Sequence, residues 1–353
     1  MPQRKSILLP TTVRIKPGAL DRVGIYLDRD DCRQVAVLRS EGLPVEFDGR
    51  LEAGCQKAGV QVVWSVEVVD AAFETMADLL QALPAGCDAL VGLGGGKALD
   101  VARYVAHLSG RPFFAVPTSL ANDGFCSPQA SLTLGGRRRS LPATLPAAVV
   151  VDTAVCLAAP DVLWWAGVGD LVAKTTAIAD WKLAFHARGT PVDDLAALLS
   201  DATVYQFMAR PEHSEEGVRL LATALMLNGI AMAICGSSRP ASGSEHLISH
   251  ALDGLTRRPR LHGLQVGVAS YLVSKLQGRG SRRIDQVLTA TGFWDGMATD
   301  PFDRDTWREA VRLAPTVKDG FHTVLSERDC LPEVDRLLAE DPRLSACIVD
   351  RKP

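Results

Sequence analysis

The pattern of apolar and polar positions changes near the middle of the chain. Up to about residue 150, short β-branched runs alternate with stretches in which apolar residues recur every three to four positions. The runs predict buried strands and the stretches predict helices. Their alternation is typical of a parallel sheet with helices on both faces. The predicted strands cover residues 34–40, 60–69, 88–94, 112–118 and 147–152, the predicted helices cover 73–83 and 98–110, and a hairpin is predicted over 130–143.

After about residue 155 the strand pattern nearly vanishes, and long stretches with helical spacing take over. We therefore predict a Rossmann-like α/β domain over residues 1–155 and an all-helical domain over 156–353. The helical stretches of this second half include residues 170–187, 193–209, 215–234 and 264–278.

Composition excludes several classes of protein but does not by itself identify one. The chain has 353 residues with a net charge of −3, which gives no electrostatic basis for binding nucleic acid. No apolar run approaches the ~18 residues of a membrane span, and the proline-broken N-terminus does not read as a signal peptide. The eight cysteines form no Cys-x-x-Cys pair, so we expect reduced thiols in a cytoplasmic protein.

Residues 92–100, "GLGGGKALD", join a predicted strand to a predicted helix. They do not match a P-loop, because Val91 replaces its first glycine and Ala98 replaces its serine or threonine. They do not match the dinucleotide fingerprint either, because Lys97 replaces the third glycine. A glycine turn at a helix N-terminus still offers free N–H groups to a phosphate. A phosphate loop is the favoured interpretation, and a turn without ligand is the alternative.

A polar cluster follows the next predicted strand. The stretch 117–131, "PTSLANDGFCSPQAS", carries Thr118, Ser119, Asn122, Asp123 and Ser127. Ligands of open α/β sheets bind outside the carboxyl ends of the strands. We therefore expect these side chains to lie near the glycine turn.

Three residues of the helical half have the types and spacing of a metal site. Asp170 lies on one predicted helix, His246 and His250 lie four apart on another, and His262 begins a third. Two imidazoles and a carboxylate with an open fourth position suit a catalytic zinc or ferrous ion. We predict one divalent metal, with zinc preferred to iron.

Five motifs, in this order and spacing, resemble the glycerol-1-phosphate dehydrogenases. These enzymes belong to the metal-dependent polyol dehydrogenases that share a fold with dehydroquinate synthase. The resemblance covers about residues 10–330, and its motifs are "GGGKALDVA", "PTSLANDGFCSPQAS", "GVGDLVAKTTAIADWKLA", "GSSRPASGSEH" and "LHGLQVG".

The resemblance implies a role for individual residues. The metal ligands would be Asp170, His246 and His262, with Asp170 also near the substrate. Asp123 and His250 would contact the substrate. The nicotinamide cofactor, NAD(H) or NADP(H), would be bound by Gly94, Gly95, Gly96, Lys97, Asp100, Thr118, Ser119, Ala121 and Ser127.

The implied reaction is reduction of dihydroxyacetone phosphate to sn-glycerol 1-phosphate. The metal would polarise the ketone oxygen, and His250 or a water held by Asp123 would relay the proton. The substrate phosphate needs an anchor, and we expect Arg239 to supply it together with the hydroxyls around it. Those hydroxyls belong to Ser237, Ser238, Ser242 and Ser244.

One position departs from the family pattern. Leu264 stands where the family usually has Glu in "LHGEQVG", which leaves the exact substrate open. Two alternatives stay beside the reductase: a dehydroquinate synthase-like cyclase or lyase, and a relative that binds nucleotide without turnover. The choice between NADH and NADPH depends on Arg39, Ser40 and Glu41, where basic and acidic residues adjoin. Self-association into a homo-oligomer is also left open.

Overall fold

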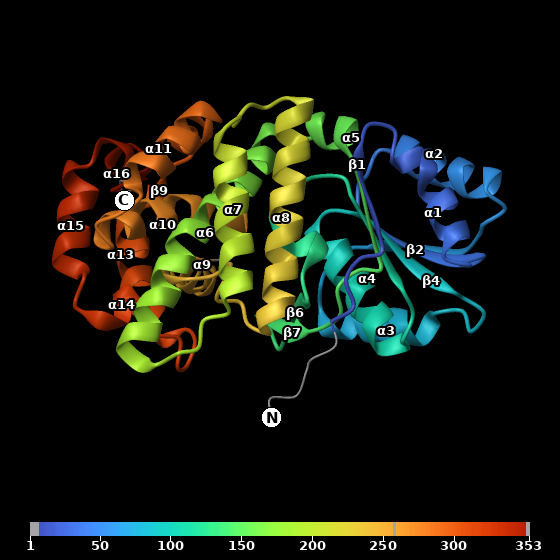
Figure 1. Ribbon diagram of the computed structural model, residues 1–353, viewed down its shortest axis with the longest axis horizontal. Coiled ribbons are helices and arrows are strands. Elements are labelled where there is room, and N and C mark those ends of the chain that lie inside the picture. Colours follow the sequence, from blue (N-terminus) through green and yellow to red (C-terminus); the bar gives the residue numbers. More distant parts are fainter. Residues whose placement is uncertain (1–6, 257–258, 351–353) are drawn as a thin grey trace. The chain divides into compact units, whose positions relative to one another are not determined.

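The computed structural model describes residues 7–256 and 259–350 (Figure 1). The chain divides into two compact units. The first unit comprises residues 1–159 and 214–234, and the second comprises residues 160–213 and 235–353. The fold class is as predicted, an α/β region followed by a helical region.

The first unit is built on a six-stranded parallel sheet with the strand order β1-β8-β5-β4-β2-β3. The chain moves outward from β2 to β3 and then returns to place β4 on the other side of β2. The switch point of this sheet therefore lies between β2 and β4. The sheet strands are β1 (Thr12–Lys16), β2 (Gln34–Ser40), β3 (Gln61–Val68), β4 (Ala89–Gly94), β5 (Phe113–Pro117) and β8 (Ala148–Asp152).

Helices cover both faces of this sheet. Alternate residues of the central strands, such as Val91 and Leu93 of β4, pack with Leu51 and Cys55 of α2 in one buried cluster. The other face is covered by α4, whose Leu99 and Ala102 lie next to β4. The helices of this unit are α1 (Val23–Arg29), α2 (Val45–Lys57), α3 (Phe73–Ala82), α4 (Gly96–Ser109), α5 (Thr153–Leu157) and α8 (Glu215–Cys235), with short 3-10 turns η1 (Leu20–Arg22) and η2 (Asp123–Cys126).

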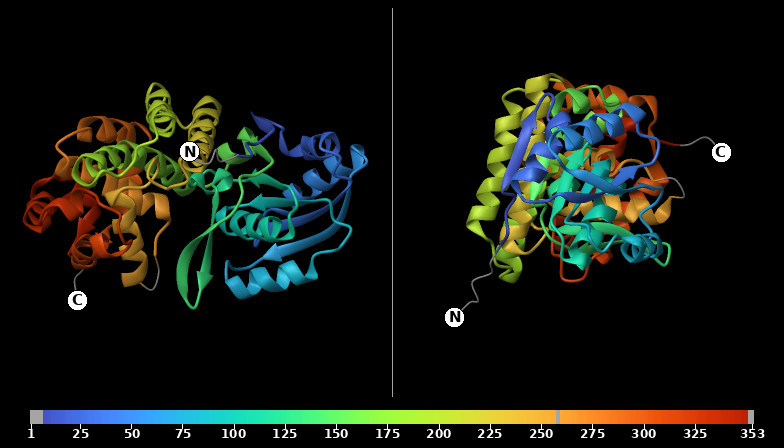
Figure 2. Two further views of the ribbon diagram at one scale, coloured as in Figure 1. Left: turned by 60° about the horizontal axis from the view of Figure 1, so that its bottom comes forward. Right: turned by 90° about the vertical axis from the view of Figure 1, so that its right-hand side faces the viewer.

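The predicted hairpin is confirmed as β6 (Gln129–Leu134) paired antiparallel with β7 (Arg137–Pro142). Its turn is made by two glycines with positive φ, as two-residue hairpin loops require. Figure 2 shows the hairpin extending from the body of the first unit. The prediction missed β1, a sheet-edge strand that is only partly buried and has no clear alternation of apolar residues.

The predicted domain boundary needs a correction, because α8 groups with the first unit and not with the other helices of the second half. A Cβ added at Gly229 of α8 would lie 1.7 Å from the carbonyl oxygen of Cys126, so the helix packs directly on η2. This helix is long and apolar enough to cross a membrane, but 61% of its most apolar window is buried inside the structure. Its apolar character is thus that of a core helix.

The second unit is almost entirely helical. Besides the helices it contains one pair of two-residue parallel strands, β9 (Phe302–Asp303) and β10 (Ile348–Val349), which the sequence pattern did not predict. Its helices are α6 (Asp161–Arg188), α7 (Asp194–Met208), α9 (Ser244–Leu255), α10 (His262–Leu276), α11 (Ser281–Ala290), α12 (Phe293–Thr299), α13 (Arg304–Leu313), α14 (Val324–Glu327), α15 (Leu331–Glu340) and α16 (Pro342–Cys347), with the 3-10 turn η3 (Ala314–Thr316).

Small residues bring α6 and α10 into backbone contact. A Cβ at Gly263 would lie 1.8 Å from the Ala166 carbonyl oxygen, and one at Gly169 would lie 2.1 Å from the Gly263 carbonyl oxygen. No side chain larger than hydrogen fits either position without moving the helices apart. This close crossing sets the distance between Asp170, which follows Gly169, and His262, which precedes Gly263.

Candidate nucleotide loop and metal centre

The glycine turn lies at the carboxyl end of β4, at the switch point of the sheet. Gly94 has φ +135, and a Cβ there would lie 2.2 Å from the Ser40 hydroxyl oxygen. The Gly95 N–H donates to that oxygen at 2.9 Å. Only glycine fits at position 94, for both backbone and packing reasons.

The next two glycines leave the N-terminus of α4 open. Gly95 is the N-cap, with no side-chain capping bond, and a Cβ at Gly96 would meet nothing within 4 Å. The first N–H groups of the helix therefore face space that a phosphate could occupy. The helix begins two residues before the predicted start at Ala98.

Two polar residues of this loop bond elsewhere in the first unit. The Lys97 ammonium donates to the Val69 carbonyl oxygen at 2.5 Å. Asp100 is buried on α4, and burial raises its pKa to about 6 although neighbouring cations act in the opposite direction. The predicted contact of Asp100 with the cofactor stays a prediction.

Arg103, which the sequence reasoning missed, is the partner of Asp100. Its side chain is fully buried and donates to the Asp100 carboxylate at 3.0 Å. It also donates to the carbonyl oxygen of Gln129 at 2.7 Å and to that of Gly124. Arg103 therefore ties α4 to the segment that holds the polar cluster. The available signal was an acid–arginine pair at i, i+3 on a mostly apolar helix.

The polar cluster lies close to the glycine turn, as predicted. The Thr118 N–H donates to the Gly94 carbonyl oxygen at 3.1 Å, so the cluster begins beside the loop. Asn122 caps the 3-10 turn η2 by accepting from the Gly124 N–H at 2.8 Å, and Asp123 is the first residue of that turn. Thr118 and Ser127 are buried, whereas Ser119, Ala121 and Asp123 are partly exposed. The geometry supports a ligand site at this edge of the sheet.

The three predicted metal ligands converge in the second unit. One donor atom from each of Asp170, His246 and His262 lies within 4.8 Å of the others. Asp170 Oδ1 is 3.5 Å from His246 Nε2, and the two imidazole rings are 5.0 Å apart between centroids. Asp170 and His246 are 1% and 7% exposed, respectively, so these two donors are shielded from bulk water, whereas His262 is partly exposed. Two imidazoles and one carboxylate at this spacing fit a divalent ion with an open coordination position.

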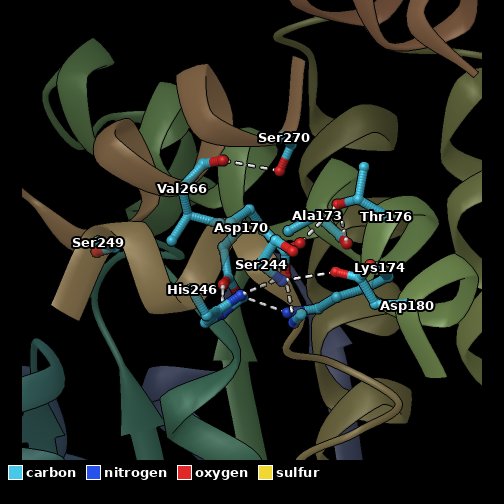
Figure 3. Close-up of polar contacts among 12 residues, drawn as sticks. Asp170, Ala173, Lys174, Thr176, Asp180, Ser244, His246, Ser249, Val266 and Ser270 are labelled. Atoms are coloured by element: carbon cyan, nitrogen blue, oxygen red, sulfur yellow. Dashed lines mark hydrogen bonds and ion pairs between the residues drawn. The ribbon is translucent and has the colours of Figure 1, made fainter. Parts of the chain in front are cut away.

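A buried lysine balances the carboxylate of this site. Lys174, one helical turn after Asp170 on α6, is fully buried and donates to Asp170 Oδ2 at 3.2 Å. Burial opposes ionisation of Asp170, but the Lys174 ammonium and His246 outweigh it and hold the Asp170 pKa well below its usual range. The carboxylate therefore stays ionised and available to a metal. Figure 3 shows Lys174 and His246 converging on Asp170.

The two histidines are each oriented by a neighbouring side chain. His246 Nδ1 bonds to Glu245 Oε1 at 2.9 Å, and Glu245 is fully buried. This bond leaves Nε2 directed at Asp170. Burial opposes the charged imidazolium, but the bonds to Asp170 and Glu245 prevail and raise the pKa of His246. A metal ion would therefore displace a proton from this ring at acidic pH.

Further hydrogen bonds hold these supports in place. Glu245 accepts from the Thr176 hydroxyl at 2.8 Å and from the Gly243 N–H at 2.5 Å. His262 Nδ1 bonds to the Ser249 hydroxyl at 3.0 Å. The Ser249 hydroxyl also lies 2.6 Å from Gln265 Oε1. Glu245, Ser249 and Gln265 were missed in the sequence, although the position beside a metal-binding histidine is where such partners occur.

His250 and Leu264 lie near the metal trio, the name used here for Asp170, His246 and His262. The ring of His250 lies 5.8 Å from that of His262, and its side chain is exposed. Leu264, which replaces the usual Glu, is buried on α10 at 5% exposure. The polar support of His262 comes instead from Ser249, so the substitution leaves the three donors in place.

The predicted phosphate anchor, Arg239, is 4% exposed. Its guanidinium lies 3.6 Å from the centre of the Phe321 ring and donates to the His322 carbonyl oxygen at 2.7 Å. The described part of the chain contains no ion-pair partner for it. Lys318 lies over the same ring and donates to the Ser238 hydroxyl at 3.0 Å. Burial, with Arg239 nearby, lowers the pKa of Lys318.

A family model and a solved structure match this chain. Residues 14–160 match the family model described as iron-containing alcohol dehydrogenase. A crystal structure of a probable glycerol dehydrogenase from Sinorhizobium meliloti has the same fold, with a TM-score of 0.70 and 20% identity over 93% of this chain and 97% of that one.

Relatives with higher sequence identity show to which enzyme family the chain belongs. A glycerol-1-phosphate dehydrogenase [NAD(P)+] from Aeropyrum pernix is 36% identical over 94% of this chain and 96% of its own length. One from Methanothermobacter thermautotrophicus is 34% identical over 95% and 98%. The chain belongs to the glycerol-1-phosphate dehydrogenase family of NAD(P)-dependent oxidoreductases. The resemblance noted in the sequence is thereby confirmed.

Proposed function

We propose that this protein interconverts dihydroxyacetone phosphate and sn-glycerol 1-phosphate with a nicotinamide cofactor and one zinc ion. The observation that carries the proposal is the convergence of Asp170, His246 and His262, with donor atoms within 4.8 Å, in a chain of this family. Zinc is preferred because two imidazoles and one carboxylate are a common catalytic zinc set. When bound, the metal would polarise the substrate oxygen, and the nicotinamide would exchange a hydride with the carbon that bears this oxygen.

Side chains of this protein orient the metal ligands, contact the substrate and transfer a proton. Glu245 and Ser249 fix the rings of His246 and His262, so the donors are arranged before the metal arrives. The ring of His250, beside His262 and open to solvent, is the group to which we assign proton transfer. Asp123 is assigned a contact with the substrate, as its position in the family motif implies.

The substrate phosphate is assigned to Arg239 and Lys318. Two cations stack against one aromatic ring, and Arg239 is buried without a carboxylate partner among the described residues. A buried guanidinium with remaining N–H donors is suited to a phosphate. Arg239→Ala should raise the substrate KM at least tenfold while the metal content stays full. An unchanged KM would remove Arg239 from the site.

The cofactor is assigned to the glycine loop and to the polar cluster at 118–127, with NADH preferred over NADPH. The preference rests on Arg39 at the end of β2, which is paired with Asp48 at 3.3 Å and with Glu67 at 3.2 Å. These carboxylates neutralise the cation at the end of β2, which would otherwise be available to a 2′-phosphate.

We place the protein in the cytoplasm, since all eight cysteines are free and seven of them are buried. Self-association stays a prediction. The exposed Leu195 and Leu198 of α7 are available for it, and sedimentation of the purified chain would test it.

A direct assay tests the function. Zinc-loaded protein receives NADH and dihydroxyacetone phosphate, and nicotinamide absorbance is followed. Net oxidation is expected, and both His246→Ala and His262→Ala should lose bound zinc and at least about a thousandfold in rate, since metal catalysis contributes several kcal/mol. His186→Ala, an exposed histidine at the end of α6, is the control. Full metal content and activity in both variants would disprove the site. Product from a heptulosonate-type substrate without net oxidation would favour the cyclase.

A further inference from the structure

One pocket of the helical unit has none of the predicted metal ligands in its lining. It has a volume of about 610 Å³ and lies among α6, α7 and the turn between α10 and α11. The labelled helices can be followed in Figure 1. Volumes of this size are typical of small-molecule sites.

The pocket is lined by an excess of positive charge. Lys182 reaches it from α6, and Arg279, Arg282 and Arg283 reach it from residues 279–283, whereas Asp201 is the one acidic residue of its lining. In the described part of the chain, Lys182, Arg279 and Arg282 make no ion pair, and all three are exposed. This cluster stands out in a protein whose net charge is −3. A concave surface lined by one sign of charge concentrates its field and attracts counter-ions.

The walls of the pocket are fixed by hydrogen bonds. The Gln277 amide donates to Asp180 Oδ1 at 3.0 Å and to the Thr176 carbonyl oxygen at 3.1 Å, which holds the arginine-bearing turn against α6. On the other side, Arg283 donates to the Tyr205 hydroxyl at 2.5 Å. The helix α11 begins at Ser281 with no side-chain cap, so its free N–H groups add to the positive potential.

We propose that this pocket binds a small molecule that carries two phosphate groups, at a site separate from the substrate site. Each phosphate monoester carries about −1.5 to −2 charges at neutral pH, so two of them match an excess of about three cations. Arginine favours phosphate because its planar N–H donors can bond two oxygens at once. Tyr205 and Ile178 also line the pocket.

The test is calorimetric titration of the zinc- and NADH-loaded protein with fructose 1,6-bisphosphate at low ionic strength. Saturating glycerol 1-phosphate is present to occupy the substrate site. Wild type should bind at one site, and Arg279→Ala with Arg282→Ala should weaken binding at least tenfold. The matched control is Arg312→Ala with Arg336→Ala, which removes the same charge from two arginines paired within their own helices. It should bind as wild type does.

Three outcomes would overturn the proposal. The first is no saturable binding of the bisphosphate by wild type, and the second is an equal loss of binding in both double variants. The third is a change of oligomeric state in the Arg279 and Arg282 variant, measured by sedimentation, which would assign the pocket to a subunit interface. Dehydrogenase activity of the same samples reports independently on the proposed function.

Discussion

The glycine loop of the first unit and the metal trio of the second are built in opposite ways. The loop uses consecutive residues, Gly94 to Gly96, and offers mainly backbone N–H groups. The trio uses side chains from three helices, and its ligands are separated by up to 92 positions in the chain, from Asp170 to His262. The loop depends on local conformation, whereas the trio depends on how closely helices pack.

Because of this difference, the two sites are stabilised by different supporting residues. Around the loop, the buried pair Asp100–Arg103 holds the neighbouring segment in place. Around the trio, the backbone contact between Gly169 and Gly263 sets the approach of α6 and α10. Changes at these supports should therefore affect one site and spare the other.

The largest effect is expected for Arg103→Met, which leaves the Asp100 carboxylate buried without its partner. Breaking a buried ion pair costs about 3–5 kcal/mol of unfolding free energy, measurable by urea unfolding of the first unit. The deficit should shrink as the pH falls. The folded-state pKa of Asp100, about 6 against an ordinary 3.8, rises further without Arg103, so the folded state gains stability on protonation. Arg137→Met, on the exposed face of β7, is the control and should change stability by less than about 0.5 kcal/mol. A pH-independent loss would contradict this explanation.

Gly263→Ala should have the second-largest effect. The added Cβ would overlap the Ala166 carbonyl oxygen, and forcing α6 and α10 apart should cost about 3 kcal/mol. Zinc content should fall as well, because Asp170 and His262 separate, while NADH binding to the first unit is retained. Gly254→Ala, on α9 with open space around it, should be neutral. Full zinc content in the Gly263 variant would show that the helix crossing does not set the metal site.

Glu245→Gln tests whether the Glu245 carboxylate orients the metal ligand His246. The amide keeps the size of the side chain but loses the charge that orients His246, so zinc affinity should fall about 10- to 100-fold. Competition with a chromophoric chelator measures it. Thr176→Val removes another bond to the same carboxylate and should show a smaller loss. Unchanged affinity in the Glu245 variant would assign its carboxylate to packing alone.

The smallest effect is expected at the end of β2. Removing both carboxylates with Asp48→Asn and Glu67→Gln frees Arg39, and kcat/KM for NADPH should rise about fivefold, since each exposed pair contributes at most about 1 kcal/mol. The value for NADH should change little. A fall in kcat/KM for NADPH would show that Arg39 does not meet the ribose.

Local pattern predicted five of the six sheet strands of the α/β unit, but not its helices α1 and α2. The strand at 34–40 was predicted with the bounds that β2 has, and the strand at 88–94 differs from β4 by one residue. The start of α4 was placed too late because glycine has a low helix propensity. The assignment of α8 failed because helical spacing reveals an apolar face but not the element that covers it.

The sequence by itself determined the alternation of strands and helices, the glycine turn at the end of β4, and the residue types of the metal trio. These follow from periodicity, backbone freedom and ligand chemistry, which act over a few residues. Only the tertiary structure decided that α8 joins the first unit and that Arg103 and Glu245 support the two sites. It also brought Asp170, His246 and His262 together. Such contacts join distant segments, and their distances depend on helix packing, which no single stretch of sequence specifies.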